Sequence, residues 1–139
     1  MQFKVRVDVA QRSSVIWSVL MDLERWPEWT RSITSIKRLD AGVLRVGSQI
    51  RIVQPKLKSL VWHVSDLVED RNLAWEARSP GLLIRAGHEI QSSGSGSVVI
   101  LTIDQTGWLS PLIGLFTAKL TRDYMDMEAQ GLKRRCETV

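Results

Sequence analysis

The sequence predicts an α+β domain in which a curved, seven-stranded antiparallel sheet wraps around a long C-terminal helix, with two short helices after the first strand. Three observations lead to this prediction. Residues 2–9 alternate between apolar and polar side chains, residues 33–107 contain strand patterns separated by short turns, and residues after Pro111 have apolar side chains at helical spacing. The 139 residues suffice for one hydrophobic core, so we expect a single domain over residues 1–139.

The N-terminal third predicts a strand followed by two short helices. Alternation over residues 2–9 is typical of a half-buried antiparallel strand, whose apolar face consists of Phe3, Val5, Val7 and Val9. Ser13 or Ser14 is expected to cap the next helix, since a serine oxygen accepts from free N–H groups at a helix start. Proline disfavours the helical conformation of the preceding residue, so Pro27 predicts a break between the two helices.

The remaining elements form a predicted antiparallel meander and a final helix. The expected strands, separated by turns rich in Gly, Asp, Asn and Ser, are 33–39, 46–54, 58–69, 72–78, 82–92 and 97–107. Pro111 suits the first helical turn, and a helix of roughly 24 residues extends about 36 Å, enough to cross a sheet. The stripe expected on this amphipathic helix recurs every three to four residues and comprises Leu112, Leu115, Phe116, Lys119, Leu120, Tyr124, Met127 and Gly131.

Composition narrows the range of functions. The net charge is +4, but the basic residues are spread along the chain, which favours a solvated surface over a specific nucleic-acid site. The single cysteine, Cys136, excludes an internal disulfide and a thiolate metal site, and we expect no metal and no cofactor. No apolar run is long enough to span a bilayer, and residues 1–9 do not resemble a signal peptide, so a cytoplasmic protein is expected.

Several motifs, taken in order, resemble one family. They are the helix Val15–Leu20 followed by Asp22-Leu23 and Trp26-Pro27-Glu28-Trp29, the strand entry Val46-Gly47-Ser48, the hairpin Trp62–Val64 to Leu73–Glu76, and the strands His88–Ile90 and Gly96–Leu101. The chain resembles the polyketide cyclase/dehydrase and lipid transport family of the START-like, or Bet v 1-like (SRPBCC), superfamily. The resemblance implies a helix-grip fold with an internal cavity for a lipid, polyketide or similar apolar ligand, and the family has catalytic and non-catalytic members.

Three titratable side chains are the candidates for chemistry. His88 shares its predicted strand face with Ile84, Ala86 and other apolar residues, so it should point inward. It can be a hydrogen-bonded core residue, a polar contact to a ligand, or a general acid or base. A regular strand would turn Asp66 toward His88, whereas a bulge would turn it outward and bury Leu67. Tyr124 is the third candidate, either contacting ligand or lying at the helix margin.

Alternation and the resemblance together predict the ligand site. Trp62 and Trp75 either line it or fill the core, while Trp17, Trp26 and Trp29 should anchor the short helices. Residues Trp108–Leu112 are expected at the cavity mouth, where an exposed apolar tip could touch a membrane. The predicted lining is Trp62, Val64, Trp75, Ile84, Ala86, His88, Trp108, Leu112, Phe116, Leu120 and Tyr124.

Three functions follow from these patterns. The first is binding or carriage of a small apolar molecule between the sheet and the C-terminal helix, without catalysis. The second is an enzyme of the cyclase, aromatase or dehydratase type, in which His88, Asp66 or Tyr124 moves protons in the same cavity. The third is a basic interaction module. The sequence leaves the ligand and the oligomeric state open.

Overall fold

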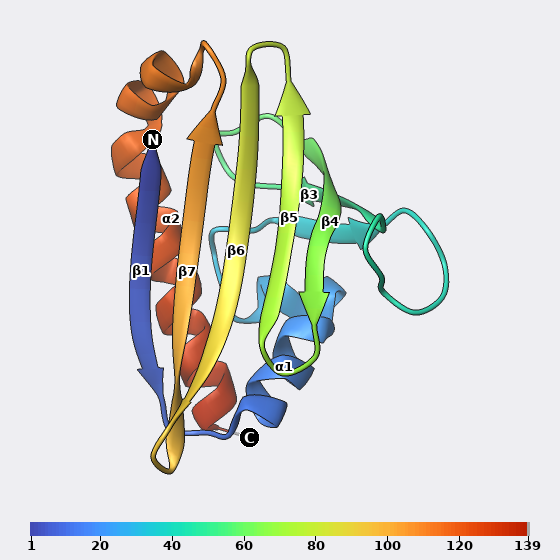
Figure 1. Ribbon diagram of the computed structural model, residues 1–139, viewed down its shortest axis with the longest axis vertical. Helices are drawn as coiled ribbons and strands as arrows, with labels where there is room; N and C mark the ends of the chain where they lie inside the picture. Colours follow the sequence, from blue (N-terminus) through green and yellow to red (C-terminus); the bar gives the residue numbers. More distant parts are fainter. Residues whose placement is uncertain (139) are drawn as a thin grey trace.

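The computed structural model describes residues 1–138 and contains the predicted elements in the predicted order (Figure 1). In chain order they are β1 (Gln2–Val9), α1 (Ser13–Met21), the 3₁₀ helix η1 (Leu23–Glu28), β2 (Ser35–Arg38), β3 (Gln49–Val53), β4 (Leu60–Val68), β5 (Asn72–Ser79), β6 (Leu82–Ser93), β7 (Gly96–Thr106) and α2 (Ser110–Glu137). None of the helices in this described range is long and apolar enough to cross a membrane.

The seven strands form one antiparallel sheet that confirms the predicted fold class. The strand order is β1-β7-β6-β5-β4-β3-β2, so the meander from β2 to β7 is completed by β1 at its far edge. In that last pair Phe3 lies opposite Ile103 and Val7 opposite Val99, which places the apolar face of β1 on the core side. The helix α2 packs against β1 and β7, and α1 with η1 covers the other side of the same face (Figure 1).

The short helices differ from the prediction in two details. The residue that caps α1 is Arg12, with no side-chain cap, rather than Ser13 or Ser14. The break between the helices lies at Asp22, with φ −83° and ψ 66°, and Pro27 sits inside η1. This earlier break turns Trp26 into the core, where its indole Nε1 donates a 3.0 Å hydrogen bond to the carbonyl of Leu20. Satisfying the indole N–H in this way allows complete burial of the ring.

The strand β4 contains the expected bulge. Its register with β5 shifts between Val64 and Asp66, which places Asp66 opposite Ala74 on the outer face. There the Asp66 carboxylate accepts a hydrogen bond from the side-chain amide of Asn72, and Leu67 packs against the core. The irregular register is therefore the alternative that buries the leucine and leaves the carboxylate outside.

The helix α2 begins where predicted but buries a different face. Its buried residues are Ser110, Gly114, Met125, Ala129, Gly131, Leu132 and Cys136. Most of the predicted stripe is exposed, namely Leu112, Leu115, Phe116, Lys119 and Met127. Small residues decide the contact, because they allow the helix backbone to approach its neighbours. A Cβ atom added to Gly131 would lie 1.8 Å from the carbonyl oxygen of Trp29.

Candidate ligand site between the sheet and the long helix

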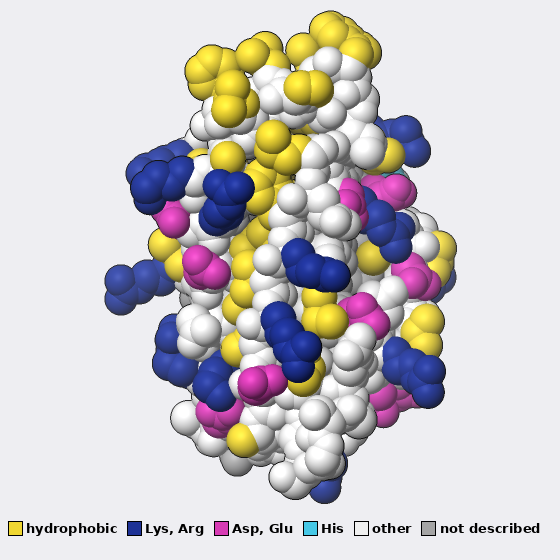
Figure 2. Space-filling model, turned by 60° about the vertical axis from the view of Figure 1, so that its left-hand side comes forward, with side chains coloured by type: hydrophobic (Ala, Val, Ile, Leu, Met, Phe, Trp, Pro, Cys, Tyr) yellow, Lys and Arg dark blue, Asp and Glu magenta, His cyan; other side chains and the backbone are white. Residues whose placement is uncertain are grey.

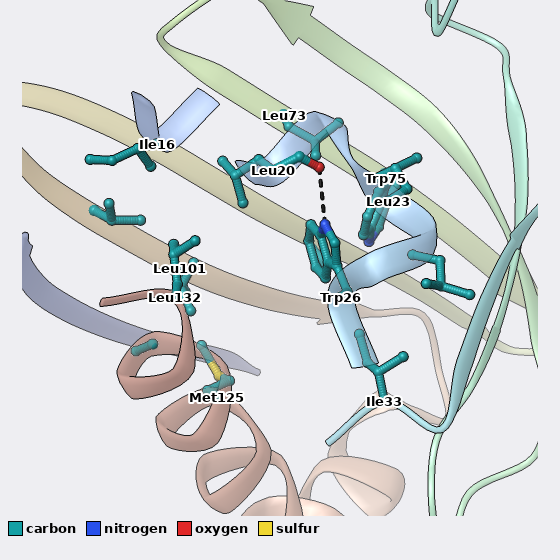
Figure 3. Close-up of a cluster of buried hydrophobic side chains, with 14 of the residues drawn as sticks. Ile16, Leu20, Leu23, Trp26, Ile33, Leu73, Trp75, Leu101, Met125 and Leu132 are labelled. Carbon is teal, nitrogen blue, oxygen red and sulfur yellow. Dashed lines mark hydrogen bonds between the residues drawn. The ribbon is translucent and has the colours of Figure 1, made fainter. Parts of the chain in front are cut away.

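Side chains on the concave side of the sheet divide into two regions. The first, which we call the packed half, comprises Ile16, Leu20, Trp26, Leu73 and Leu132, all with 0% exposure. It lies where α1 and η1 cover the sheet beside the C-terminal half of α2. Figure 3 shows Trp26 in this cluster, with Leu73 and Trp75 on one side, Leu132 on α2 farther away, and the indole nitrogen pointing to the carbonyl of Leu20. This region is filled by the protein's own side chains.

Aromatic contacts tie the packed half together. The ring centroid of Trp26 lies 5.0 Å from that of Trp29 and 5.4 Å from that of Trp75, in tilted arrangements. The imidazole of His88 lies 5.3 Å from both Trp26 and Trp75, with its ring nearly perpendicular to each. Such tilted and edge-to-face pairs are favourable geometries for aromatic rings. Trp26 and Trp75 therefore fill the core around His88.

His88 points inward as predicted, and both of its ring nitrogens are engaged. Its Nδ1 is 3.0 Å from the carbonyl oxygen of Leu73, and its Nε2 is 2.8 Å from Oε1 of Glu128 on α2. A carbonyl oxygen only accepts hydrogen bonds, so Nδ1 carries a proton. The hydrogen bond between Nε2 and Oε1 then requires a proton on one of these two atoms. The pair links α2 to β6 through a partly buried hydrogen bond.

The other two candidates for chemistry lie elsewhere. Asp66 is on the outer face, so the alternative in which it pairs with His88 is wrong, and the reason is the bulge in β4. The hydroxyl of Tyr124 donates to the carbonyl of Pro55 in the β3–β4 connection, at the margin of α2. The three side chains do not converge in one pocket. The real partner of His88, Glu128, was missed, although an acid between Met125 and Leu132 interrupts the buried face of α2.

The second region, which we call the open half, lies at the other end of the same concave surface. It comprises Leu60, Ile84 and Ile103 on the sheet and Leu120 and Tyr124 on α2, and each is only half-buried. The strand registers place the three sheet residues on the core side, next to buried Trp62 and Ala86. These inward-facing side chains therefore keep some contact with solvent.

Two buried polar side-chain atoms have no hydrogen-bond partner, and one of them lies in the open half. Gln105 lies opposite Ile84 in the β6–β7 register and is 4% exposed, and its Oε1 has no hydrogen-bond partner among residues 1–138. The hydroxyl of Ser59, at the start of β4, is likewise buried and unpartnered within that described range. Buried acceptors of this kind cost free energy unless they are satisfied. The open half therefore offers hydrogen-bonding capacity beside its apolar surface.

The predicted lining residues are split by the structure. Trp62, Val64, Trp75, Ala86 and His88 are buried, while Ile84, Leu120 and Tyr124 are half-buried in the open half. Trp108, Leu112 and Phe116 are exposed at the outer end of the molecule and do not line the interior. The physical reason is that the first turns of α2 present small residues to the sheet and their large side chains to the outside.

Three other features of residues 1–138 concern possible functional groups: the single cysteine, the His, Cys, Asp and Glu side chains, and an open groove. Burial raises the pKa of Cys136 to about 11, so this thiol stays protonated and is a poor nucleophile near neutral pH. Within residues 1–138 no group of three His, Cys, Asp or Glu side chains is placed to hold a metal ion. An open groove of about 680 Å³, which the sequence did not predict, runs between Trp29–Arg31 and the C-terminal half of α2. A 2.9 Å ion pair between Arg135 and Glu28 crosses its rim.

Comparisons with known proteins agree with this architecture. The sequence profile described as polyketide cyclase/dehydrase and lipid transport matches residues 1–137. A START superfamily protein from Mycobacterium smegmatis superposes with a TM-score of 0.80 at 19% identity, covering 99% of this chain and 97% of that one. The Zhui aromatase/cyclase from Streptomyces sp. R1128 gives 0.79 at 14% identity, covering 99% and 93%. A protein from Thermobifida fusca gives 0.79 at 16% identity, covering 97% and 92%. No curated protein matches the sequence.

Proposed function

This chain belongs to the polyketide cyclase/dehydrase and lipid transport family, and we propose that it binds a small apolar molecule in the open half, between the sheet and α2. The observation that carries the proposal is the incomplete burial of Leu60, Ile84 and Ile103, which face the core but are not fully covered. A guest that covered these side chains would gain roughly 25 cal/mol for each Å² of apolar surface removed from water. The packed half, by contrast, has no side chain left to cover.

The unpartnered acceptor of Gln105 indicates the chemistry of the guest. A ligand with a hydroxyl or N–H group at one end would donate to Oε1 and satisfy this buried atom. The remainder of the molecule would be apolar, because Ile84 and Ile103 flank that position. We therefore expect the bound compound to be mostly hydrocarbon with a polar group at one end.

The contact between Tyr124 and Pro55 suggests a route of entry. It joins α2 to the β3–β4 connection, on the side of the open half that no helix covers (Figure 1). One hydrogen bond from an exposed hydroxyl contributes little to stability, so it can break at small cost. Under the proposal, the guest enters between these two segments and the hydroxyl closes the gap behind it.

A catalytic alternative rests on the His88–Glu128 pair, which can store and transfer one proton. In this alternative the chain is a cyclase, aromatase or dehydratase, and the substrate reaches His88 from the open half. Trp26 and Trp75 both pack against the His88 ring, and the ring already uses both of its nitrogens. These contacts favour binding over catalysis.

The test combines a generic probe with variants that fill the open half. N-phenyl-1-naphthylamine, an uncharged dye that fluoresces in apolar sites, is titrated into the wild type and into Ile84→Trp. The matched control is Val43→Trp, at a position that is 85% exposed in the β2–β3 connection. We expect the Ile84→Trp variant to bind the dye at least about tenfold more weakly, equivalent to 1.4 kcal/mol, and the control to bind normally. Thermal unfolding verifies that both variants are folded.

Native mass spectrometry of the purified chain provides a second readout. A mass excess that disappears on denaturation, and that is absent from Ile84→Trp, would support the proposal and give the ligand's mass. If the wild type binds no dye and carries no excess mass, the proposal is wrong. If both variants bind the dye equally, the site lies outside the open half.

A further inference from the structure

Large apolar side chains gather at the outer end of the molecule, where β7 leads into α2. The most exposed are Trp108 at 79%, Phe116 at 80%, Leu115 at 71% and Leu112 at 53%. Figure 2 shows several groups of hydrophobic atoms gathered at this end of the molecule. We call these four residues the apolar tip. A cluster of this kind on a water-exposed surface marks a binding surface.

The apolar tip is held in place by the fold. Leu112, Leu115 and Phe116 follow helical spacing on one side of α2, opposite the buried Ser110 and Gly114. Trp108 rests on the β5–β6 turn: a Cβ atom added to Gly81 would lie 2.7 Å from its indole ring. The next residue, Leu109, donates its backbone N–H to the carbonyl of Gly81 at 2.9 Å. The large side chains therefore project from a rigid platform, which lowers the entropy cost of docking.

The charges around the tip are of both signs, with basic residues in excess. The segment from Gln105 to Ala118 contains no charged residue, and the charges that border it are Asp104 on β7, Lys119 on α2 and Arg78 on β5. Both nearby carboxylates have a basic residue beside them. Asp123 pairs with Lys119 at 2.7 Å, and Asp104 lies opposite Arg85 in the strand register. An apolar surface with a border of net positive charge is complementary to an anionic lipid bilayer.

From this arrangement we propose that the apolar tip docks onto the surface of an anionic membrane, with Trp108 and Phe116 inserted at the level of the headgroups and Arg78 and Lys119 facing lipid phosphates. A second copy of the chain fits less well, because a contact between two tips would bring like charges together. The docking surface does not depend on the proposed function, since a chain with no internal ligand would present the same tip.

The chain contains its own reporter for the test. Trp108 is exposed, whereas the other five tryptophans are at most 8% exposed. The full chain is mixed with vesicles of phosphatidylcholine alone or of phosphatidylcholine with phosphatidylglycerol, and binding is measured by co-sedimentation and tryptophan fluorescence. We expect binding and a blue shift with the anionic vesicles, quenching by brominated lipid, and weaker binding at high salt. The variant Trp108→Phe should keep most of the binding and lose the spectral shift.

Matched variants distinguish vesicle binding by the apolar tip from nonspecific binding by other exposed apolar side chains. The double variant Leu112→Ser/Phe116→Ser should lose at least about tenfold in vesicle partitioning, because less apolar surface inserts. The control Val43→Ser/Val46→Ser removes exposed apolar side chains from the β2–β3 connection and should bind normally. Arg78→Gln and Lys119→Gln should each weaken binding about fivefold on anionic vesicles. All of these variants should bind N-phenyl-1-naphthylamine as the wild type does, so failure here is distinguishable from failure of the proposed function.

Three results would overturn the inference. The first is an absence of binding to either vesicle, and the second is equal loss in the tip and control variants. The third is concentration-dependent self-association that Leu112→Ser/Phe116→Ser abolishes, without vesicle binding, which would assign the tip to a second copy of this chain. Equal binding to neutral and anionic vesicles would overturn the role given to Arg78 and Lys119.

Discussion

The packed half and the open half share one sheet and one long helix, yet they differ in how far their side chains are covered. In the packed half, α1 and η1 lie over the sheet and place Trp26 in the core, where it is fully buried in the same cluster as Leu73 and Leu132. In the open half no helix performs this role, and Ile84 and Ile103 remain partly accessible although they face inward. The difference shows that the segment between β1 and β2 fills one end of the fold and leaves side chains at the other end partly accessible.

The two halves also use polar groups differently. The packed half contains one polar cluster, His88 with Glu128 and the Leu73 carbonyl, and every hydrogen-bonding atom of the imidazole has a partner. In the open half, the Oε1 of Gln105 has none among residues 1–138. Satisfied buried groups stabilise a unique core, and unsatisfied ones mark places where a ligand can form the missing bond. The hydrogen bonding of buried polar atoms therefore distinguishes the packed half from the open half in the same way as the burial of their side chains.

The largest effect is expected from Trp26. Replacing it with Ala empties the centre of the packed half and should lower the free energy of unfolding by about 3–5 kcal/mol, as for other buried aromatic residues. Trp108→Ala, the same change at the apolar tip, should cost less than about 1 kcal/mol because that ring is largely exposed. Urea denaturation followed by circular dichroism measures both. If Trp26→Ala does not fold, Trp26→Phe provides a smaller loss that can still be measured, and equal losses at the two positions would contradict the comparison.

Two aliphatic truncations test the difference in burial directly. Leu73→Ala in the packed half should cost about 2–5 kcal/mol, since the cavity it leaves cannot be filled. Ile84→Ala in the open half should cost no more than about 1.5 kcal/mol, because the side chain is already partly hydrated. Chemical denaturation of each variant gives the two values. An Ile84→Ala loss as large as that of Leu73→Ala would mean that the open half is in fact a closed core.

A third pair of variants tests the hydrogen bond between His88 and Glu128. Glu128→Ala leaves Nε2 of His88 without a partner and should lower the free energy of unfolding by about 1–3 kcal/mol. In Glu128→Gln the amide N–H₂ can donate to the neutral imidazole, so this variant should lose less than half as much. The comparison is made by denaturation at neutral pH. A larger loss for Gln than for Ala would indicate that the imidazole needs a carboxylate charge beside it.

The sequence predicted those features of the structure for which a residue pattern determines the direction of the side chains. Strand alternation is such a pattern, so the inward faces of β1 and β6, including His88, were predicted correctly. The bulge at Asp66 was also within reach, because an apolar Leu67 competes with the acid for the inward position. Together with the order of turns, these local signals were sufficient for the sheet and the fold class.

The features that the sequence did not predict depend on contacts between distant elements. Hydrophobic spacing on α2 pointed to Leu112 and Phe116, whereas the buried face is set by small residues such as Ala129 and Gly131, which have a weak hydrophobic signal. Glu128 lies 40 residues from His88, and no sequence spacing relates the two. The open half was not visible either, because alternation shows that Ile84 points inward but not that anything covers it.

The smallest effect concerns Cys136, which anchors the far end of the packed half. Burial raises its pKa from 9.0 to about 11, so the folded chain holds this proton more tightly than the unfolded chain. The resulting stabilisation is fully present below pH 9 and is lost as the pH rises through 11. At pH 10 the wild type should have lost about 1 kcal/mol from this thiol relative to Cys136→Ala, whose curve lacks the contribution. Lysine and tyrosine titrations are common to both proteins, so the difference between their unfolding free energies at pH 8 and pH 10 isolates the thiol. A pH-independent difference would show that Cys136 ionises as readily in the folded chain as in the unfolded one, and that the packed half is open at this end as well.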